Sequence, residues 1–148
     1  KVLGARSSIK TVTEDLVYVM QKIYIKRALI FDLSGLRGCW FKGDAQDLEE
    51  MLGNLLDNAC KWAKSRVQLA CSTHDGRLCV MVEDDGPGVS GDEFENVTRR
   101  GYKLDESKPG HGQGLGIVKD IADLYGGSLK LSRSELGGLQ AKLELPSA

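Results

Sequence analysis

The sequence lacks several features that mark particular classes of protein. No uninterrupted apolar run approaches the ~20 residues that span a bilayer, and no signal peptide is visible. The 20 Lys and Arg residues nearly balance the 21 Asp and Glu residues, so neither nucleic acid nor an anionic membrane is expected as the main partner of the chain itself. The four cysteines include no Cys-x-x-Cys pair, which argues against structural zinc and favours reduced cysteines in the interior.

The composition suits one compact domain. The chain has 148 residues, of which 41% are apolar and 28% charged, enough to bury about two-thirds of the unfolded surface in a single core. We expect residues 11–148 to form this domain and residues 1–10 to be the end of a preceding segment.

Periodicity and turn signals predict an α+β fold, a two-layer sandwich with a mostly antiparallel mixed sheet covered on one face by helices. One helix is predicted from a cap at Thr11 or Thr13 to Tyr24, a second from the cap Asp44 to about residue 63, and a third over 115–125. Strands are predicted at 28–33, 39–42, 66–73, 77–83, 128–133 and 139–145, with hairpin turns at 74–76 and 136–138.

Four alternating glycines at positions 110, 112, 114 and 116 lead into the third predicted helix. Such glycines let backbone N–H groups approach an anion at the positive end of a helix, although a simple loop is an open alternative. The spacing is not that of a dinucleotide-binding fingerprint, and without any Gly-Lys pair the chain has no P-loop.

Two further patterns supply candidate ligand groups. Asn54, Asn58 and Lys61 share one face of the second predicted helix, where amide oxygens suit Mg²⁺ and the ammonium suits a phosphate; a solvated polar face is the alternative. Asp84 ends a strand before Gly86 and Gly88, and its carboxylate would accept a hydrogen bond from the adenine amino group and repel the guanine carbonyl. A plain Asp-Gly turn is the alternative there.

Between these glycine clusters, the charged stretch 99–108 has the composition of a lid over a polyphosphate or of a solvated loop. The order of the patterns, an Asn-x-x-x-Asn-x-x-Lys helix, a hairpin, Asp-x-Gly-x-Gly, a basic stretch and Gly-x-Gly-x-Gly, resembles the ATP-binding domain shared by sensor histidine kinases, gyrase B, Hsp90 and MutL. The resemblance covers about residues 40–146 and is greatest to PhoQ-type sensor kinases of bacterial two-component systems, through GNLLDNACK and EDDGPG.

The resemblance implies ATP and Mg²⁺ as ligands. It implies catalytic roles for Asn54 and Lys61 and metal binding by Asn58 and Asn54. The residues it places on the nucleotide are Asn54, Asn58, Lys61, Trp62, Asp84, Gly86, Gly88, Lys103, Lys108, His111, Gly112, Gln113, Gly114, Leu115 and Gly116. The chain departs from PhoQ-type relatives at four of these: Lys103 and Lys108 replace arginines, His111 replaces Gln, and Trp62 replaces Tyr.

The resemblance also implies a function. ATP-hydrolysing relatives carry Glu where this chain has Asn54, and an amide cannot accept a proton from water, which favours a kinase over a gyrase-like or Hsp90-like ATPase. No histidine precedes His74, so the phosphoacceptor would lie on a separate dimerisation domain, with a response regulator as the next partner. The resemblance implies a monomeric cytoplasmic domain of an inner-membrane sensor protein; a degenerate regulatory ATP-binding module is a further alternative.

Overall fold

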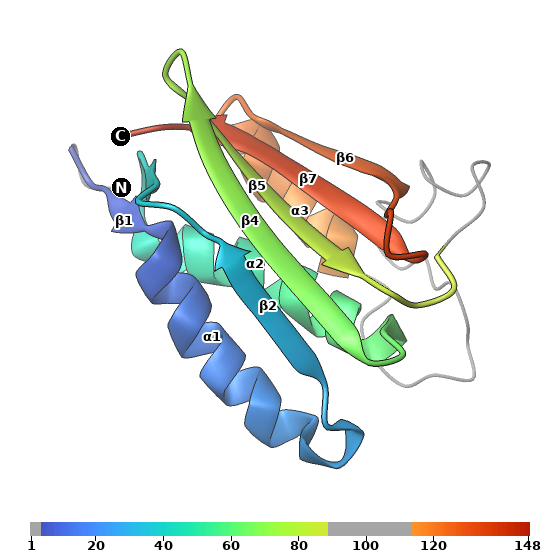
Figure 1. Ribbon diagram of the computed structural model, residues 1–148. Helices are drawn as coiled ribbons and strands as arrows, with labels where there is room; N and C mark the ends of the chain where they lie inside the picture. The colour runs from blue at the N-terminus through green and yellow to red at the C-terminus, as the bar shows by residue number, and fades with distance from the viewer. Residues whose placement is uncertain (1–3, 89–113) are drawn as a thin grey trace.

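The computed structural model describes residues 4–88 and 114–148. Its main sheet has five strands in the order β2-β4-β5-β7-β6, in which only β2 and β4 are parallel. The strands are β2 (Ile30–Gly35), β4 (Arg66–His74), β5 (Arg77–Asp84), β6 (Ser128–Arg133) and β7 (Leu139–Pro146), and a second small sheet pairs β1 (Ser7–Ser8) with β3 (Trp40–Phe41). This mixed, mostly antiparallel arrangement is the predicted α+β sandwich (Figure 1).

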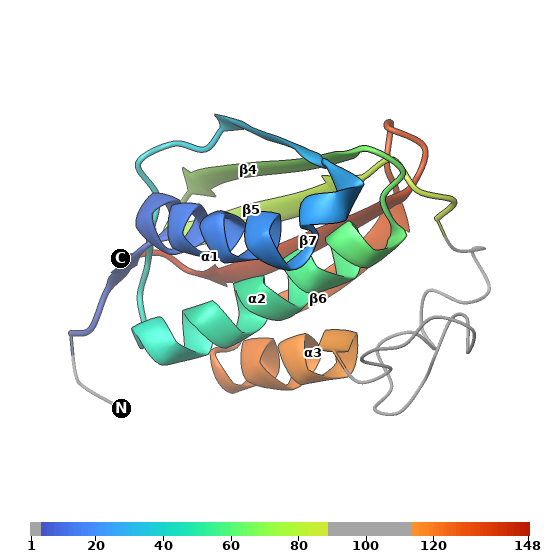
Figure 2. The ribbon, with the colours of Figure 1, turned by 90° about the horizontal axis from the view of Figure 1, so that it is seen from below.

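The helices form a layer on one face of the main sheet (Figure 2). They are α1 (Ile9–Ile23), α2 (Ala45–Trp62) and α3 (Gly114–Leu124), and the short 3₁₀ helix η1 (Ile25–Arg27) follows α1. In Figure 2, α2 lies between α1 and α3. The core is therefore bounded by one apolar stripe from each helix and by one face of the sheet.

Alternation along the strands explains why only one sheet face is covered. In β5, β7 and the first six residues of β4 every second side chain is buried, while most of the intervening ones are partly exposed; the last three residues of β4 are exposed. On α2 the buried side chains are Leu48, Met51, Leu52, Leu55, Leu56, Ala59 and Cys60. Its other face is left for polar residues, as the sequence predicted.

Most predicted elements lie within two residues of their predicted bounds, and local chemistry explains the agreement. Asp44 caps α2, its carboxylate accepting from the N–H of Gln46. The β4–β5 hairpin turns at Asp75 and Gly76, both with positive φ (51° and 75°), as a two-residue primed turn requires. The cysteines are free thiols, with Cys79 partly buried and the other three buried.

Two predictions about the first half of the chain were wrong. The cap of α1 is Ser8, whose hydroxyl accepts from the N–H of Thr11, whereas Thr13 is a buried interior residue of the helix. The predicted strands 28–33 and 39–42 do not share one sheet, because Trp40 and Phe41 pair with Ser8 and Ser7. Tertiary pairing, rather than the local sequence, therefore fixes where α1 begins.

The N-terminal end of α2 is tied to the C-terminal end of α3. The Tyr125 hydroxyl donates to the Asp47 carboxylate and accepts from the N–H of Asp44 at 3.4 Å. The Phe41 and Tyr125 rings meet edge to face at 4.8 Å, and a Cβ added to Gly43 would lie 2.5 Å from the Phe41 ring. Only glycine at position 43 allows this close packing.

Candidate functional site

The predicted ligand groups within the described residues come from three elements that meet at one end of the molecule. In Figure 2 the C-terminal end of α2, the end of β5 and the beginning of α3 all lie at the end opposite the Tyr125 contact. The polar face of α2, the Asp84 turn and the first glycines of α3 are therefore brought together by the fold.

The polar face of α2 presents two amides and one ammonium. Asn54, Asn58 and Lys61 are all half-buried, between the buried stripe of the helix and solvent. The side-chain amide nitrogen of Asn54 donates to the Glu50 carbonyl at 2.8 Å, which fixes the amide along its own helix. Amide oxygens are hard ligands that suit Mg²⁺, and an ammonium suits a phosphate oxygen, so this face fits a magnesium-bound polyphosphate.

Asp84 is the buried carboxylate of the site, with 2% of its surface exposed. Its Oδ1 accepts from the backbone N–H of Gly86 at 2.8 Å and of Leu139 at 3.4 Å. Its backbone carbonyl accepts from the N–H of Gly138 at 3.1 Å. Backbone groups of two separate turns thus hold this carboxylate in one orientation.

Burial raises the pKa of Asp84 from 3.8 to about 6. The backbone N–H groups of Gly86 and Leu139 oppose this rise, and the neighbouring carboxylates of Asp85 and Glu83 add to it. At neutral pH most of the group is ionised, because a pKa of about 6 lies below 7. A buried carboxylate with a perturbed pKa at the end of a strand is typical of a functional position.

Two glycines allow the chain to approach Asp84 and the end of α2. A Cβ on Gly138 would lie 2.1 Å from Oδ1 of Asp84, and a Cβ on Gly86 would lie 2.3 Å from the Trp62 carbonyl oxygen. Real Cβ atoms do not approach other atoms so closely, so both positions require glycine. Gly88 has a positive φ of 72° and faces the Gly138 carbonyl.

The sequence did not reveal the part played by the β6–β7 turn. Gly137 and Gly138 were predicted only as a hairpin turn, yet Gly138 and Leu139 contact Asp84 directly. Ser134, in the same connection, is buried and its hydroxyl donates to Glu83 at 2.8 Å. The pair of adjacent glycines was the one available signal, because a two-glycine turn permits a close backbone approach as well as a change of direction.

Asp85 was also missed, and it has a structural role beside the site. Its Oδ1 accepts from the backbone N–H groups of Lys64 (2.8 Å), Ser65 (3.0 Å) and Arg66 (3.1 Å), and its Oδ2 accepts from the Ser65 hydroxyl at 2.8 Å. Partial burial tends to raise the pKa of Asp85, but these hydrogen bonds outweigh it and hold the pKa at about 2. Asp85 therefore fixes the connection between α2 and β4.

The first turn of α3 begins the last part of the site. Gly114, Leu115 and Gly116 are all buried, and they open the helix as predicted. The other residues predicted on this side of the nucleotide lie outside the described residues; they are Lys103, Lys108, His111, Gly112 and Gln113.

The helix layer on a mixed five-stranded sheet is an α+β sandwich, with a buried carboxylate turn beside a helix end that carries Asn and Lys. Residues 43–148 match the family model described as histidine kinase-, DNA gyrase B-, and HSP90-like ATPase. The chain belongs to this family, and within it to the catalytic ATP-binding domains of sensor histidine kinases.

Curated relatives support that placement. The chain is 54% identical over 112 residues to sensor protein kinase CarS of Pseudomonas aeruginosa, which covers 76% of the chain and 24% of the relative. It is 33% identical over 132 residues to sensor protein PhoQ of Escherichia coli, which covers 89% of the chain and 27% of the relative. The chain thus spans about a quarter of the length of these relatives.

Solved structures agree on the fold. The mycobacterial sensor histidine kinase MprB is similar with a TM-score of 0.85 at 25% identity, covering 97% of each chain. Full-length ShkA, solved in complex with AMPPNP, is similar with a TM-score of 0.82 at 27% identity over 97% of this chain and 31% of that one. Among the residues described, no helix has both the length and the apolar character to span a membrane.

Proposed function

We propose that this domain binds ATP together with Mg²⁺ and that Asp84 recognises the adenine. The ionised carboxylate would accept a hydrogen bond from the adenine amino group, whereas the guanine carbonyl would be repelled. The observation that carries the proposal is the burial of Asp84 within a cradle of backbone groups from two turns that only glycine can form. A carboxylate with so little access to water is retained at a cost, which suits a group that pairs with a ligand.

The phosphates would lie between α2 and the beginning of α3. Asn58, with Asn54, would offer amide oxygens to Mg²⁺, which neutralises phosphate charge when bound, and Lys61 would pair with a phosphate oxygen. Backbone N–H groups at the start of α3 would face the same anion. Further contacts are proposed from Trp62, Gly86, Gly88, Lys103, Lys108, His111, Gly112, Gln113, Gly114, Leu115 and Gly116.

We further propose that the complete protein is a histidine kinase that passes the γ-phosphate to a histidine of its dimerisation domain and then to a response regulator. The relatives' names support a sensor kinase, and by analogy this domain would lie on the cytoplasmic side of an inner membrane. Asn54 supports transfer over hydrolysis, because its amide donates to Glu50 and has no basic atom with which to activate water. Steady-state phosphate release by the pure domain would instead favour an ATPase.

Calorimetric titration tests the nucleotide site. The domain is titrated with a non-hydrolysable ATP analogue and with its GTP counterpart, each with and without Mg²⁺. We expect magnesium-dependent binding of the adenine nucleotide alone, after which transfer to the dimerisation domain of the full-length protein can be assayed. Equal binding of both nucleotides would contradict adenine recognition by Asp84.

Asn58→Ala tests the metal ligand. Loss of one amide oxygen should reduce the gain in nucleotide affinity that Mg²⁺ provides, by about tenfold, the usual effect of removing a group next to a metal. Glu49→Ala, on an exposed part of the same helix, is the matched control. An unchanged magnesium response in Asn58→Ala would exclude Asn58 as a ligand.

A further inference from the structure

The β6–β7 connection, residues 134–138, holds the end of β5 from both faces of the sheet. Successive side chains of a strand point to opposite faces, so Glu83 and Asp84 face away from each other. The Ser134 hydroxyl donates to Glu83 at 2.8 Å. The backbone N–H groups of Gly138 and Leu139 donate to the carbonyl and the carboxylate of Asp84. The connection and the first residue of β7 therefore contact both acids.

Ser134 is the residue around which this connection is folded. It is buried, with 3% of its surface exposed. Its N–H donates to the Gly138 carbonyl at 2.8 Å, and its carbonyl accepts from the N–H of Gly137 at 2.9 Å. Its hydroxyl accepts from the N–H of Leu136 at 3.0 Å while it donates to Glu83. Every polar group of Ser134 therefore has a partner, and all but Glu83 lie within the connection.

A hydroxyl side chain suits both tasks at this position. It can accept from the N–H of Leu136 and donate to a carboxylate at the same time. A hydrogen bond to a carboxylate is stronger than one between two neutral groups, because the acceptor carries charge. The bond from Ser134 to Glu83 therefore fastens the connection to the face of β5 that the helices leave uncovered.

The position of the connection affects Asp84 through Gly138. The carbonyl of Gly138 accepts from Ser134, and its N–H donates to the Asp84 carbonyl at 3.1 Å. The next N–H, that of Leu139, donates to Oδ1 of Asp84 at 3.4 Å. A Cβ on Gly138 would lie 2.1 Å from the same Oδ1, so the two turns are packed closely. A small shift of the connection would therefore change the direction of the Asp84 carboxylate.

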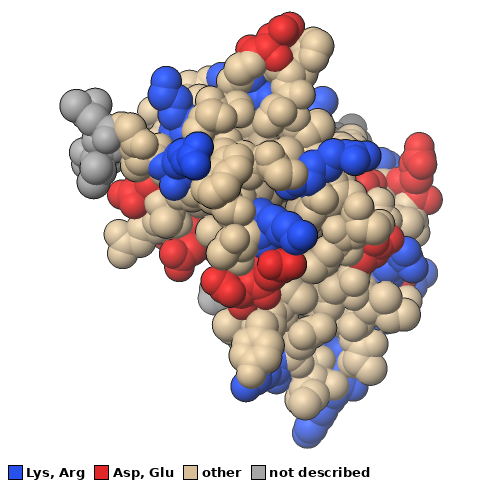
Figure 3. Space-filling view, turned by 60° about the vertical axis from the view of Figure 1, so that its left-hand side comes forward, with Lys and Arg blue, Asp and Glu red and all other residues tan. Residues whose placement is uncertain are grey.

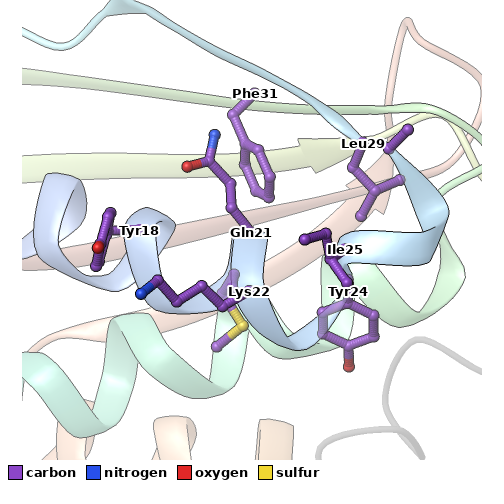
Figure 4. Close-up of a pocket in the computed structure, with 9 residues that line it drawn as sticks. Tyr18, Gln21, Lys22, Tyr24, Ile25, Leu29 and Phe31 are labelled. Atoms are coloured by element: carbon purple, nitrogen blue, oxygen red, sulfur yellow. The ribbon is translucent and has the colours of Figure 1, made fainter.

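The α2 side of the site is held by other bonds. Tyr24 lines a hollow between α1, η1 and β2, and in Figure 4 its hydroxyl points away from Phe31. That hydroxyl donates to Asp57 at 2.6 Å, and Arg27 donates to the Ala63 carbonyl, so the C-terminal end of α2 is fastened to η1. Basic and acidic atoms are interspersed over the face shown in Figure 3, which therefore contributes no field of one sign. Short-range hydrogen bonds thus hold both sides of the site.

We infer that Ser134 and Glu83 are positioning residues for the carboxylate that recognises adenine. Their hydrogen bond fixes the β6–β7 connection on β5, and the connection fixes the direction in which Asp84 presents its carboxylate to the base. The inference rests on the proposed recognition of adenine by Asp84 and adds the residues on which its selectivity depends. Loss of the bond lowers the affinity for ATP and leaves the affinity for triphosphate unchanged, because the phosphates bind elsewhere in the proposed site.

Two substitutions at Glu83 isolate the hydrogen bond. Glu83→Gln removes the charge but keeps a carbonyl oxygen that accepts from Ser134, whereas Glu83→Ala removes both the charge and the acceptor. Calorimetry with ATP and with inorganic triphosphate, each with Mg²⁺, compares the two variants at equal net charge. We expect Glu83→Ala to bind ATP about tenfold more weakly than Glu83→Gln, the order of effect of one hydrogen bond to a charged group. Both variants should bind triphosphate equally.

Ser134→Ala should reproduce this loss from the other partner. We expect it to bind ATP about tenfold more weakly than the wild-type domain. Added to Glu83→Ala, it should cause no further loss, because both substitutions remove the same bond. Ser132→Ala is the matched control, since the exposed Ser132 hydroxyl donates to Gln140 at 3.1 Å between the same two strands. Glu83 is only partly buried, so its variants decide the test if Ser134→Ala does not fold.

NMR of the domain without nucleotide measures the effect on Asp84 separately. The amide proton shifts of Gly138 and Leu139 respond to their hydrogen bonds with Asp84. We expect both signals to move upfield in Glu83→Ala, as these bonds lengthen, and to stay in place in Glu83→Gln. Unmoved signals in Glu83→Ala would overturn the inference.

The binding data distinguish failure of this inference from failure of the proposed function. A wild-type domain that binds ATP no more tightly than triphosphate would overturn adenine recognition by Asp84, and this inference with it. A wild-type preference for ATP that persists in full in Glu83→Ala would overturn the positioning role alone. Equal losses in Glu83→Gln and Glu83→Ala would also overturn it, because the charge of Glu83 and not its hydrogen bond would then be responsible.

Discussion

Asp84 and Asp85 differ in burial and in hydrogen bonding, and the difference supports the proposed ligand-binding role of Asp84 and a structural role of Asp85. Asp84 is 2% exposed and its pKa is raised to about 6, whereas the hydrogen bonds to Asp85 hold its pKa at about 2. Asp85 receives four donors from the connection between α2 and β4. The protein stabilises the ionised form of Asp85, whereas burial destabilises the ionised form of Asp84, as expected if Asp84 pairs with a bound ligand.

The sign of each pKa shift gives opposite pH dependences of stability. Asp84 binds its proton more tightly in the folded state, so its contribution to stability falls as pH rises from about 4 to about 6. Asp85 binds its proton less tightly in the folded state, so its contribution is complete above about pH 4 and is lost as pH falls toward 2. Adjacent residues therefore favour folding at opposite ends of the acidic range.

Of the substitutions considered, Gly138→Ala should have the largest effect, because it disrupts the packing around Asp84. The added Cβ would lie 2.1 Å from Oδ1 of Asp84 and 2.6 Å from the nitrogen of Gly86, so backbone must move. We expect the free energy of unfolding to fall by about 3 kcal/mol, at the upper end of the range for overpacking, and nucleotide binding to be lost. Denaturant titration measures the first and calorimetry the second. Gly38→Ala, where nothing lies within 4 Å, is the control; equal stability of the two variants would contradict the close packing.

Asp84→Asn should separate binding from stability. Replacing the acceptor of the adenine amino group should weaken ATP by about 1.5–3 kcal/mol, as for a hydrogen bond to a charged group, and should barely affect inorganic triphosphate. The free energy of unfolding at pH 7 should not fall, because a buried charge is removed. Calorimetry with both ligands and denaturant titration test the two parts. Equal losses for ATP and triphosphate would exclude adenine recognition.

Asp85→Ala should lower stability without lowering nucleotide affinity, the reverse of what we expect for Asp84→Asn. Removing the acceptor of three backbone N–H groups should lower the free energy of unfolding by about 1–2 kcal/mol, comparable to the loss of a strong helix cap. Asp85→Asn keeps one acceptor oxygen and should lose less. Nucleotide affinity, measured at a temperature where both variants are folded, should change by less than about twofold. A loss of affinity as large as that of Asp84→Asn would remove the distinction between the two carboxylates.

The smallest expected effect is the pH dependence of ATP binding, which tests the difference between Asp84 and Asp85 directly. If the ionised form of Asp84 accepts a hydrogen bond from the adenine amino group, the affinity for ATP should be constant above about pH 7. Below about pH 6 it should decrease with falling pH, with a limiting slope of about tenfold per pH unit. The same titration with Asp84→Asn should lack this fall, while Asp85→Asn should retain it. Calorimetry from pH 5 to 8, compared with free triphosphate to correct for phosphate protonation, measures the effect.

The two carboxylates also show how far sequence reasoning reaches. Asp84 could be identified because its signals are local: it ends a strand, and Gly86 and Gly88 follow at once. The role of Asp85 depends on donors about 20 residues earlier in the chain, and the cradle of Asp84 depends on Gly138, which is far away in sequence. Nothing in the local pattern of either turn specifies those partners.

The same limit applies to the elements of the fold. Asp44 and the Asp75–Gly76 turn were predicted because a cap and a primed turn are specified by neighbouring residues. Thr11, Thr13 and Ser8 are all acceptable helix caps, and pairing of β1 with β3 selects Ser8.

The contact of Tyr125 with Asp47 and Phe41 joins the N-terminal end of α2 to the C-terminal end of α3. This contact lies at the end of the molecule opposite the C-terminal end of α2, so a rotation of one helix about it would produce the greatest displacement at the end that carries Asn58 and Gly114. A small change of angle between the two helices would therefore change the separation of the residues proposed to bind phosphate, while the joined ends would stay together.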